Sequence, residues 1–302
     1  MKKERFMDML KAGEQVFAPC VWDCYSAKAA ELAGFRAMML SGASVSRSMV
    51  GAPDLGVLNI EELIWATDRI CNFSPLPLIV DADEGYGDSP LNTYHNMSRL
   101  VKAGAQGFTL DDGMGIRGYV RMPKYYPLNQ GRHPYELMPT EQWLAKLKAA
   151  LAAIEGTDCV LIARTEVRVN EGLDEAIDRC RRAQDLGAHM TMINKVIGLE
   201  EARYVHERVD GWKMYPDIVS HNGETDADLK ELMSLNFNFV TIHYLEKASI
   251  YGMMKFGKQV RKDGSTACFD GLDLGMTPEE QQAMLHMDHP RWLEKEAEWM
   301  GR

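Results

Sequence analysis

The sequence predicts an α/β protein of 302 residues, folded as a closed (β/α)8 barrel. Short, nearly continuous apolar runs alternate eight times with longer segments of helical period, as expected for strands that are buried on both faces. Polar residues follow successive predicted strands at their carboxyl ends, where a barrel places its active site. An open, doubly wound sheet is the second choice, and it is disfavoured because no GxGxxG turn follows the first predicted strand.

Apolar runs, caps and chain-breaking residues set the element limits. Strands are predicted at 16–22, 36–40, 78–83, 107–110, 159–164, 189–193, 211–215 and 237–242. Helices are predicted at 26–33, 60–72, 91–103, 140–154, 173–186, 199–207, 226–235 and 247–257, after a short amphipathic N-terminal helix. Gly34, Gly104 and Gly187 stand directly behind three of these helices, and Thr140 is expected to cap its own helix.

Composition narrows the class of protein. The formal net charge of −10 and the absence of a basic block argue against nucleic-acid or anionic-membrane partners. Six cysteines are scattered without zinc-ribbon or CxxC spacing, which favours reduced thiols. The first residues lack the apolar core of a signal peptide, and no apolar run approaches 18 residues, so we expect a cytoplasmic protein without a membrane partner. We expect one barrel domain over residues 1–302.

The stretch from Leu78 to Gly87 predicts a metal site. Its apolar run ends in Asp81 and Asp83, and a Gly-rich turn follows. Side chains two residues apart share a face of an extended strand. Ionised carboxylates at the end of a buried strand cost several kcal/mol unless a cation or hydrogen bonds compensate, and Mg2+ takes such oxygen ligands directly or through water. The alternative is an acidic strand end solvated in a loop.

Polar groups also follow the neighbouring strands. Residues 41–44 follow the second predicted strand, Asp111 and Asp112 end the fourth, and residues 164–166 end the fifth. The connection from Gly113 to Pro139, about 27 residues long, exceeds the usual length of a structureless loop and suggests a functional lid. It carries the cationic and aromatic residues Arg117, Tyr119, Arg121, Lys124, Tyr125, Tyr126, Arg132 and His133. The alternative is a solvated surface loop.

The segment 247–302 is rich in Trp and Met, including Trp292 and Trp299. Exposed residues of these types at this density usually pack on something. Because a closed barrel would already have its core, we expect these C-terminal helices to lie at a subunit interface. The alternative is that they fold back onto their own barrel.

Several motifs, at 35–44, 52–56, 80–87, 108–112 and 162–165, resemble the isocitrate lyase/phosphoenolpyruvate mutase superfamily, in particular its methylisocitrate lyase-like members. The resemblance runs from about Leu10 to Gly257. It implies a (β/α)8 barrel, a homotetramer that exchanges its last helix between subunits, and Mg2+ beneath a mobile lid, with Mn2+ as an alternative ion. Members make or break C–C or P–C bonds beside a 2-oxo or 2-hydroxy carboxylate.

The resemblance also implies roles for matched residues. For the metal site, Asp83 would bind Mg2+ most directly, and three more acids would complete the site mostly through water: Asp81, Asp54 and Asp111. For a small anionic carboxylate substrate, the N–H groups around Ser41, Gly42 and Ala43 would hold its carboxylate. Arg164 would pair with the carboxylate oxygens, because its planar fork offers two donors where a Lys offers a point charge.

The departures from the family pattern concern the lid and the substrate site. Lyases of this family carry a Cys in the lid as general acid or base, whereas residues 113–119 read GMGIRGY. The phosphonate members' Asn and Ser lid pattern is missing too. Candidate acids or bases are therefore Tyr119, Tyr125, His133, His243 and His221. Glu84 replaces a usual Thr and Lys195 follows an altered strand end, so we expect these two to pair or to reshape substrate recognition.

The expected function is a Mg2+-dependent carbon–carbon lyase acting on a 2-oxo or 2-hydroxy di- or tricarboxylate through a metal-stabilised enolate. Retro-aldol cleavage and decarboxylation both fit. The first alternative is P–C bond chemistry, as in a phosphonopyruvate hydrolase or a phosphoenolpyruvate mutase. The second is a non-catalytic barrel that binds a carboxylate.

Overall fold

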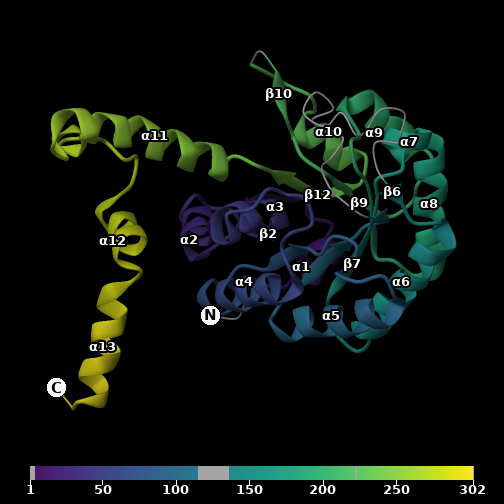
Figure 1. Cartoon of the computed structure of the whole chain (residues 1–302), viewed down its shortest axis with the longest axis horizontal. Coiled ribbons are helices and arrows are strands. Elements are labelled where there is room, and N and C mark those ends of the chain that lie inside the picture. Colours follow the sequence, from purple (N-terminus) through teal and green to yellow (C-terminus); the bar gives the residue numbers. More distant parts are fainter. Residues whose placement is uncertain (1–3, 115–135, 222, 302) are drawn as a thin grey trace.

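The structure of the chain, a computed structural model, describes residues 4–114, 136–221 and 223–301. Its central sheet is a closed barrel of parallel strands in the order β1-β12-β9-β8-β7-β4-β3-β2 (Figure 1). The predicted barrel is confirmed, and closure between β1 and β12 excludes the open sheet. The barrel strands are β1 (Val16–Val21), β2 (Met38–Leu40), β3 (Leu78–Asp81), β4 (Gly107–Leu110), β7 (Val160–Thr165), β8 (Met190–Ile193), β9 (Trp212–Tyr215) and β12 (Phe237–Ile242).

Helices surround the barrel at the predicted intervals, and further helices follow beyond residue 257. The longer ones are α1 (Phe6–Lys11), α2 (Cys24–Leu32), α4 (Ile60–Phe73), α5 (Pro90–Lys102), α6 (Thr140–Ala153), α8 (Leu173–Leu186), α9 (Gly198–His206), α10 (Leu229–Ser234), α11 (Leu245–Asp263), α12 (Pro278–His286) and α13 (His289–Trp299). The expected Thr140 cap is wrong, because Thr140 is already the first helical residue and Pro139 holds the N-cap position without a side-chain bond.

The connections contain short elements that the sequence did not predict. Helix α3 (Gly42–Val45) and a π-helical turn (Ser46–Val50) follow β2, and α7 (Arg168–Glu171) follows β7. The two ends of the long connection after β4 pair as the antiparallel strands β5 (Gly113–Met114) and β6 (Glu136–Leu137). A second hairpin joins β10 (Ser220–His221) to β11 (Glu224–Thr225).

Apolar packing closes one end of the barrel. Phe6, Met9 and Leu10 of α1 are buried in the cluster that fills the barrel interior. The Phe6 ring meets Phe239 of β12 edge-on, with 5.1 Å between centroids. Because α1 covers the amino ends of the strands, the carboxyl ends are left for a functional site.

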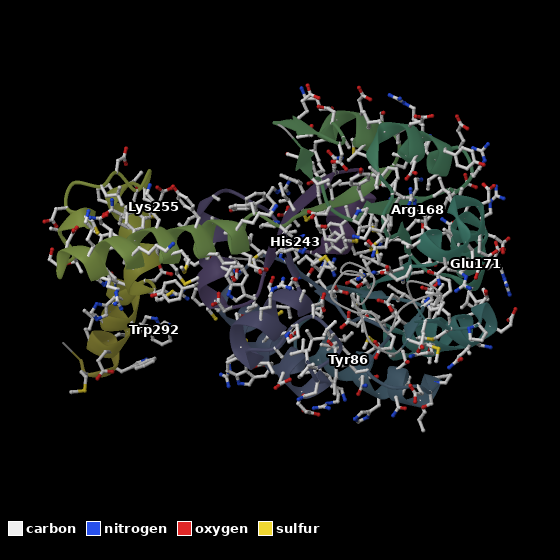
Figure 2. All side chains as sticks on the ribbon, turned by 45° about the horizontal axis from the view of Figure 1, so that its top comes forward. Tyr86, Arg168, Glu171, His243, Lys255 and Trp292 are labelled. Carbon is white, nitrogen blue, oxygen red and sulfur yellow. The ribbon has the colours of Figure 1, made fainter. Side chains whose placement is uncertain are left out.

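The C-terminal helices extend away from the barrel. Helix α11 projects outward, and α12 and α13 follow it along the side of the molecule (Figure 1). Leu245 is the last buried residue of the described chain. Trp292, on this arm in Figure 2, is 63% exposed, and Trp299 is 73% exposed. Within the described residues, an ion pair from Lys28 Nζ to Asp288 at 3.1 Å ties the segment to α2. Across the described residues, no helix combines the length and apolarity needed to cross a membrane.

Candidate active site

A cavity of about 520 Å3 opens at the carboxyl ends of the barrel strands. It gathers most of the residues that the sequence singled out. Those that line it are Ser41, Ala43, Asp54, Asp81, Asp83, Asp111, Arg164, Lys195 and His243. A Cβ placed on Gly42 would lie 3.7 Å from Asp83 Oδ2, so this backbone borders the same space. Glu84 is partly buried and does not line the described part of the cavity.

Other predicted residues fall where the structure gives no description. Tyr119, Tyr125 and His133, with the rest of the cationic and aromatic group of the lid, lie outside the described residues. His221 lies on the described strand β10, but its side chain is outside the description. The proposed roles of these residues stay predictions.

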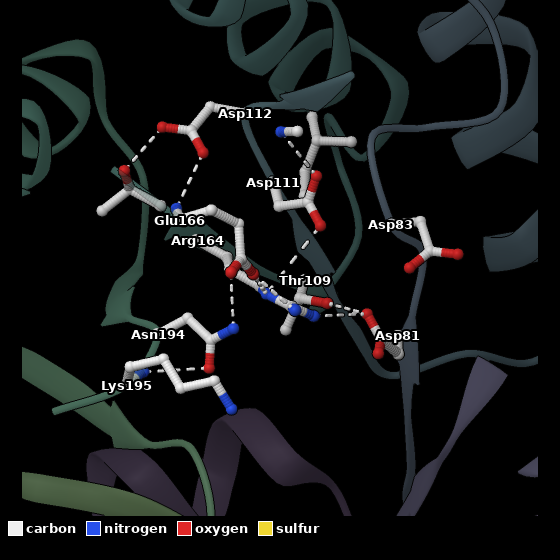
Figure 3. A network of polar contacts seen from close by, with 12 residues as sticks. Asp81, Asp83, Thr109, Asp111, Asp112, Arg164, Glu166, Asn194 and Lys195 are labelled. Atoms are coloured by element: carbon white, nitrogen blue, oxygen red, sulfur yellow. Dashed lines mark hydrogen bonds and ion pairs between the residues drawn. The ribbon is translucent and has the colours of Figure 1, made fainter. Parts of the chain in front are cut away.

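Arg164 is the centre of a carboxylate network (Figure 3). Its Nε donates to Glu166 Oε1 at 2.7 Å, and its Nη1 donates to Asp81 Oδ1 at 3.0 Å. Asp111 Oδ2 lies 3.8 Å from the same Nε. Burial works against the charge, but Glu166, Asp81 and Asp111 raise the pKa of Arg164 well above its usual range. Arg164 is therefore a fixed cation that orients the acids around it.

The strand-three acids adopt a different backbone from the one predicted. The predicted strand 78–83 is too long: β3 ends at Asp81, and Asp83 has a φ of 51°. Gly85 N donates to Ala82 O at 2.9 Å, so a turn begins directly after the strand. Asp81 and Asp83 therefore do not share one face of an extended strand. The turn still directs both into the cavity, and Asp81 Oδ1 accepts from Thr109 Oγ1 at 2.9 Å.

Burial controls the protonation of the neighbouring groups. Asp83 Oδ2 accepts from the Tyr86 hydroxyl at 3.2 Å, and burial raises the pKa of Tyr86 well above its usual range. Burial likewise raises the pKa of Asp111 well above its usual range, although Arg164 opposes this shift. Asp111 accepts from Gly113 N at 2.9 Å, and its own N–H donates to Asp83 O at 2.8 Å. Two backbone hydrogen bonds thus fix Asp111 at a position where burial disfavours its charge.

This donor chemistry fits a hard divalent cation. Asp81, Asp83 and Asp111 offer only oxygen ligands to the cavity, and a positive charge there would offset the cost of burying Asp111. Within residues 4–114, 136–221 and 223–301, no group of three His, Cys, Asp or Glu side chains is arranged to hold a metal alone. A cation here would therefore take water or ligand oxygens besides one or two carboxylates, as Mg2+ commonly does.

Sequence reasoning missed the residues that support this network. Asn194 Nδ2 donates to Glu166 Oε2 at 2.6 Å. Asp112 accepts from Glu166 N at 2.8 Å and from Arg179 Nη1 at 2.8 Å, and this ion pair is buried. Arg179 was not predicted because an arginine on an amphipathic helix suggests a surface residue.

The sequence also did not predict most of the residues on the cavity wall opposite the acids. His243 Nδ1 lies 3.2 Å from Asp217 Oδ2, and both residues line the cavity together with Cys20. Arg47 and Glu246 form two further bonds of 2.8 Å at the cavity edge. Cys20 could have been found, because it lies at the carboxyl end of the first strand, where the rule applied to the other strands also holds.

Comparison with known proteins identifies the family of this barrel. The family model described as phosphoenolpyruvate phosphomutase matches residues 6–257. The petal death protein of Dianthus caryophyllus is 30% identical, covering 99% of this chain and 89% of its own. The 2,3-dimethylmalate lyase of Eubacterium barkeri is 29% identical over 87% of each chain.

A solved structure gives the same result. The crystal structure of a 2,3-dimethylmalate lyase, described as a phosphoenolpyruvate mutase/isocitrate lyase superfamily member, superposes with a TM-score of 0.80. The two chains are 26% identical, and the match covers 96% of each. This chain belongs to the phosphoenolpyruvate phosphomutase family, within that superfamily of barrel enzymes.

Proposed function

We propose that this protein is a Mg2+-dependent carbon–carbon lyase that acts on a 2-oxo or 2-hydroxy di- or tricarboxylate through an enolate. One observation carries the proposal: a buried guanidinium, Arg164, is held by Asp81 and Glu166 beside the further acids Asp83 and Asp111. Such an excess of buried carboxylate favours a bound cation. The names of the relatives, which include lyases of branched and methylated carboxylates, support this reaction class.

For the metal, Asp83 would be the most direct ligand, and Asp81, Asp54 and Asp111 would act mostly through water. Mg2+, or Mn2+ in its place, supplies charge stabilisation to the enolate oxygen when bound. Arg164 holds Asp81 and Glu166 in fixed positions, so these acids need little reorganisation during the reaction.

The substrate carboxylate would lie against the start of α3. The N–H groups of Gly42 and Ala43 lie in the first turn of this helix, where backbone donors lack helical acceptors. Arg164 would contribute to the same carboxylate from across the cavity. Lys195, which lines the cavity, would recognise a second carboxylate, and Glu84 would influence this recognition by pairing with Lys195. The proton donors proposed from sequence are Tyr119, Tyr125, His133 and His243.

The test is a proton and phosphorus NMR time course with Mg2+ and then with EDTA. The panel contains oxaloacetate, isocitrate, 2-methylisocitrate, 2,3-dimethylmalate and phosphonopyruvate. Metal-dependent release of pyruvate or glyoxylate from a carbon-only substrate supports the lyase. Turnover of phosphonopyruvate alone would favour P–C chemistry, which the family description keeps as the alternative. No turnover across the panel would favour a barrel that only binds carboxylates.

Asp83→Ala tests the metal assignment directly. We expect it to abolish turnover while the circular dichroism spectrum is retained. The matched control is Asp88→Ala, an exposed acid of the same connection, which should keep wild-type activity. Full activity of Asp83→Ala would disprove the ligand assignment.

We also propose that residues 247–302 pack against further copies of this chain, in a homotetramer located in the cytoplasm. Large apolar side chains on this arm are exposed, with Met253 at 67% and Trp292 at 63%. All six cysteines are described and none forms a disulfide, which supports a reducing compartment. Analytical ultracentrifugation of the wild type and of Trp292→Glu would test the assembly. A wild-type monomer would contradict it.

A further inference from the structure

Three residues from neighbouring strands meet on the cavity wall opposite the acids. Cys20 is in β1, Asp217 follows β9, and His243 directly follows β12. These strands are adjacent in the barrel, where β12 pairs with both β1 and β9. The register that places Pro19 beside Ile242 brings Cys20 next to His243. All three side chains line the cavity.

A short contact joins His243 to Asp217, and the pairing of β1 with β12 places Cys20 on the other side of His243. Asp217 holds His243 at two points: Oδ2 lies 3.2 Å from Nδ1, and Oδ1 accepts the His243 backbone N–H at 3.2 Å. The barrel register places Cys20 beside the same imidazole, whose charge acts on the thiol. Because Nδ1 faces Asp217, Nε2 is the ring nitrogen left for the thiol. Glu246 of α11 and Asp81 of β3 are the further charged groups that act on this pair.

Cys20 lies at the apolar floor of the cavity. It is 3% exposed and belongs to the cluster that fills the barrel interior. Three methionines from the neighbouring strands line the same floor: Met39, Met192 and Met214. Because the substrate carboxylate is proposed to lie against α3 and Arg164, the reacting carbon of the substrate fits against this floor. A thiol on this floor can reach a substrate carbon in the cavity.

We propose that Cys20 is a catalytic residue that donates the proton to the enolate carbon, and that His243, positioned by Asp217, returns a proton to the thiolate. This inference rests on the proposed lyase function. In the step, the S–H bond breaks and the enolate double bond supplies the electron pair for the new C–H bond, while the enolate C–O becomes a carbonyl. The thiolate then takes the Nε2 proton of His243, and the imidazole takes a proton from solvent.

The protonation states agree with this direction of transfer. Burial raises the pKa of the Cys20 thiol, so sulfur keeps its proton at neutral pH. Burial opposes an imidazolium, but Cys20 and Asp217 raise the pKa of His243 to about 10. The thiol therefore carries its proton before the reaction, and the imidazole is protonated once Cys20 has become a thiolate. The His243 side chain is 39% exposed, which gives solvent access for its reprotonation.

The first experiment needs no turnover. The wild-type protein with Mg2+ is treated with methyl methanethiosulfonate, with and without oxalate, a planar dianion that resembles an enolate. Peptide mass spectrometry then follows each cysteine. We expect oxalate to slow the modification of Cys20 at least tenfold and to leave Cys268, outside the cavity, unchanged. Equal modification of Cys20 with and without oxalate would overturn the proposal.

The second experiment uses the substrate found by NMR. Cys20→Ser and His243→Gln should each lower kcat by about 100-fold, the effect typical of a lost general acid, with KM within about twofold. Asp217→Asn should lower kcat less, because it only positions the imidazole. Cys24→Ser on α2, outside the cavity, is the matched control and should behave as wild type. Cys20→Ala is the second variant should the serine variant fail to fold.

The outcomes separate this inference from the proposed function. If the wild-type protein turns over no carboxylate, the proposed lyase function is wrong. The proposed proton transfer from Cys20 is then wrong as well, even if oxalate protects Cys20. If the wild type is active and Cys20→Ser keeps the same kcat, only the proposed proton transfer from Cys20 is disproved. A stable mass increase on Cys20 that equals a substrate fragment would show a covalent nucleophile instead and would also overturn the proposal.

Discussion

The buried ion pair between Arg179 and Asp112 makes a sharp prediction about stability. Asp112 is fully buried and accepts hydrogen bonds from Glu166 N, Thr165 Oγ1 and Arg179 Nη1. Arg179 also donates to Met138 O at 3.2 Å. The pair therefore joins the ends of β4 and β7 to α8 and to the chain that leaves the long connection.

The substitution Arg179→Met keeps much of the side-chain volume and removes the charge. It leaves the Asp112 carboxylate buried with two hydrogen bonds instead of three. Breaking a buried pair in this way costs about 3–5 kcal/mol, because one charge stays uncompensated. We expect urea unfolding, followed by circular dichroism, to show a loss in the free energy of unfolding within this range.

The dependence on pH follows from the sign of the Asp112 shift. Burial already raises the pKa of Asp112, and removal of Arg179 will raise it further. The folded variant then binds a proton that the unfolded chain has released. Its loss in the free energy of unfolding, relative to the wild type, therefore grows as pH rises above the ordinary aspartate pKa. We expect a smaller deficit at about pH 4.5 than at about pH 7.5.

The control is Arg182→Met on the same helix. Arg182 pairs with Glu141, whose side chain is 80% exposed, so this substitution should change stability little. The double variant Arg179→Met/Asp112→Asn should recover part of the loss, because no unpaired charge remains. Equal small effects of Arg179→Met and Arg182→Met would refute the claim that burial makes the first pair important.

Two further predictions concern local packing and a buried lysine. Gly104→Ala should destabilise by about 1–3 kcal/mol more than Gly156→Ala by urea unfolding, because both glycines have positive φ but only the Gly104 Cβ would lie 2.7 Å from Cys71 Cβ. Similar losses in the free energy of unfolding for the two variants would show that the Cys71 side chain can move away from the added Cβ without destabilising the protein. Burial lowers the pKa of Lys213 to about 8. Between about pH 8 and pH 10.5, Lys213 is therefore protonated in the unfolded chain but neutral in the folded protein. Its contribution to the free energy of unfolding rises with pH across that window. Lys213→Met should lose this rise in unfolding measured at both ends of the window, and an unchanged slope would contradict the shift.

The sequence predicts the regular elements well because local signals bound them. Strand β4 and helix α8 coincide with their predicted limits, since Gly187 ends the helix in a left-handed conformation. The same reasoning fails at Asp83, where the run of Asp, Glu and Gly permits a turn that strand periodicity cannot anticipate. Short elements such as α3 arise from tertiary context and carry no apolar period of their own.

The sequence predicts which residues lie together at the candidate site, but it does not predict which side chains bond to each other there. The rule that strand ends meet at one rim brings Asp81, Asp83, Asp111 and Arg164 together correctly. It does not say that Arg164 would be held by Asp81 and Glu166, because the choice of partner depends on side-chain geometry across strands. Arg179 was missed for the same reason, since only burial of its helix face distinguishes it from Arg182.

Barrel closure explains why the cavity has two chemically different walls. Strands β3, β4 and β7 are neighbours and supply the acids and Arg164, whereas β1, β12 and β9 are neighbours on the other side and supply Cys20, His243 and Asp217. Cys20 and His243 are far apart in the sequence, and they meet only because the first and last strands pair. In the proposed reaction, the first wall binds the anionic end of the substrate while the second wall delivers a proton to its carbon end. The division of the proposed reaction between two walls therefore follows from the order of strands around the barrel.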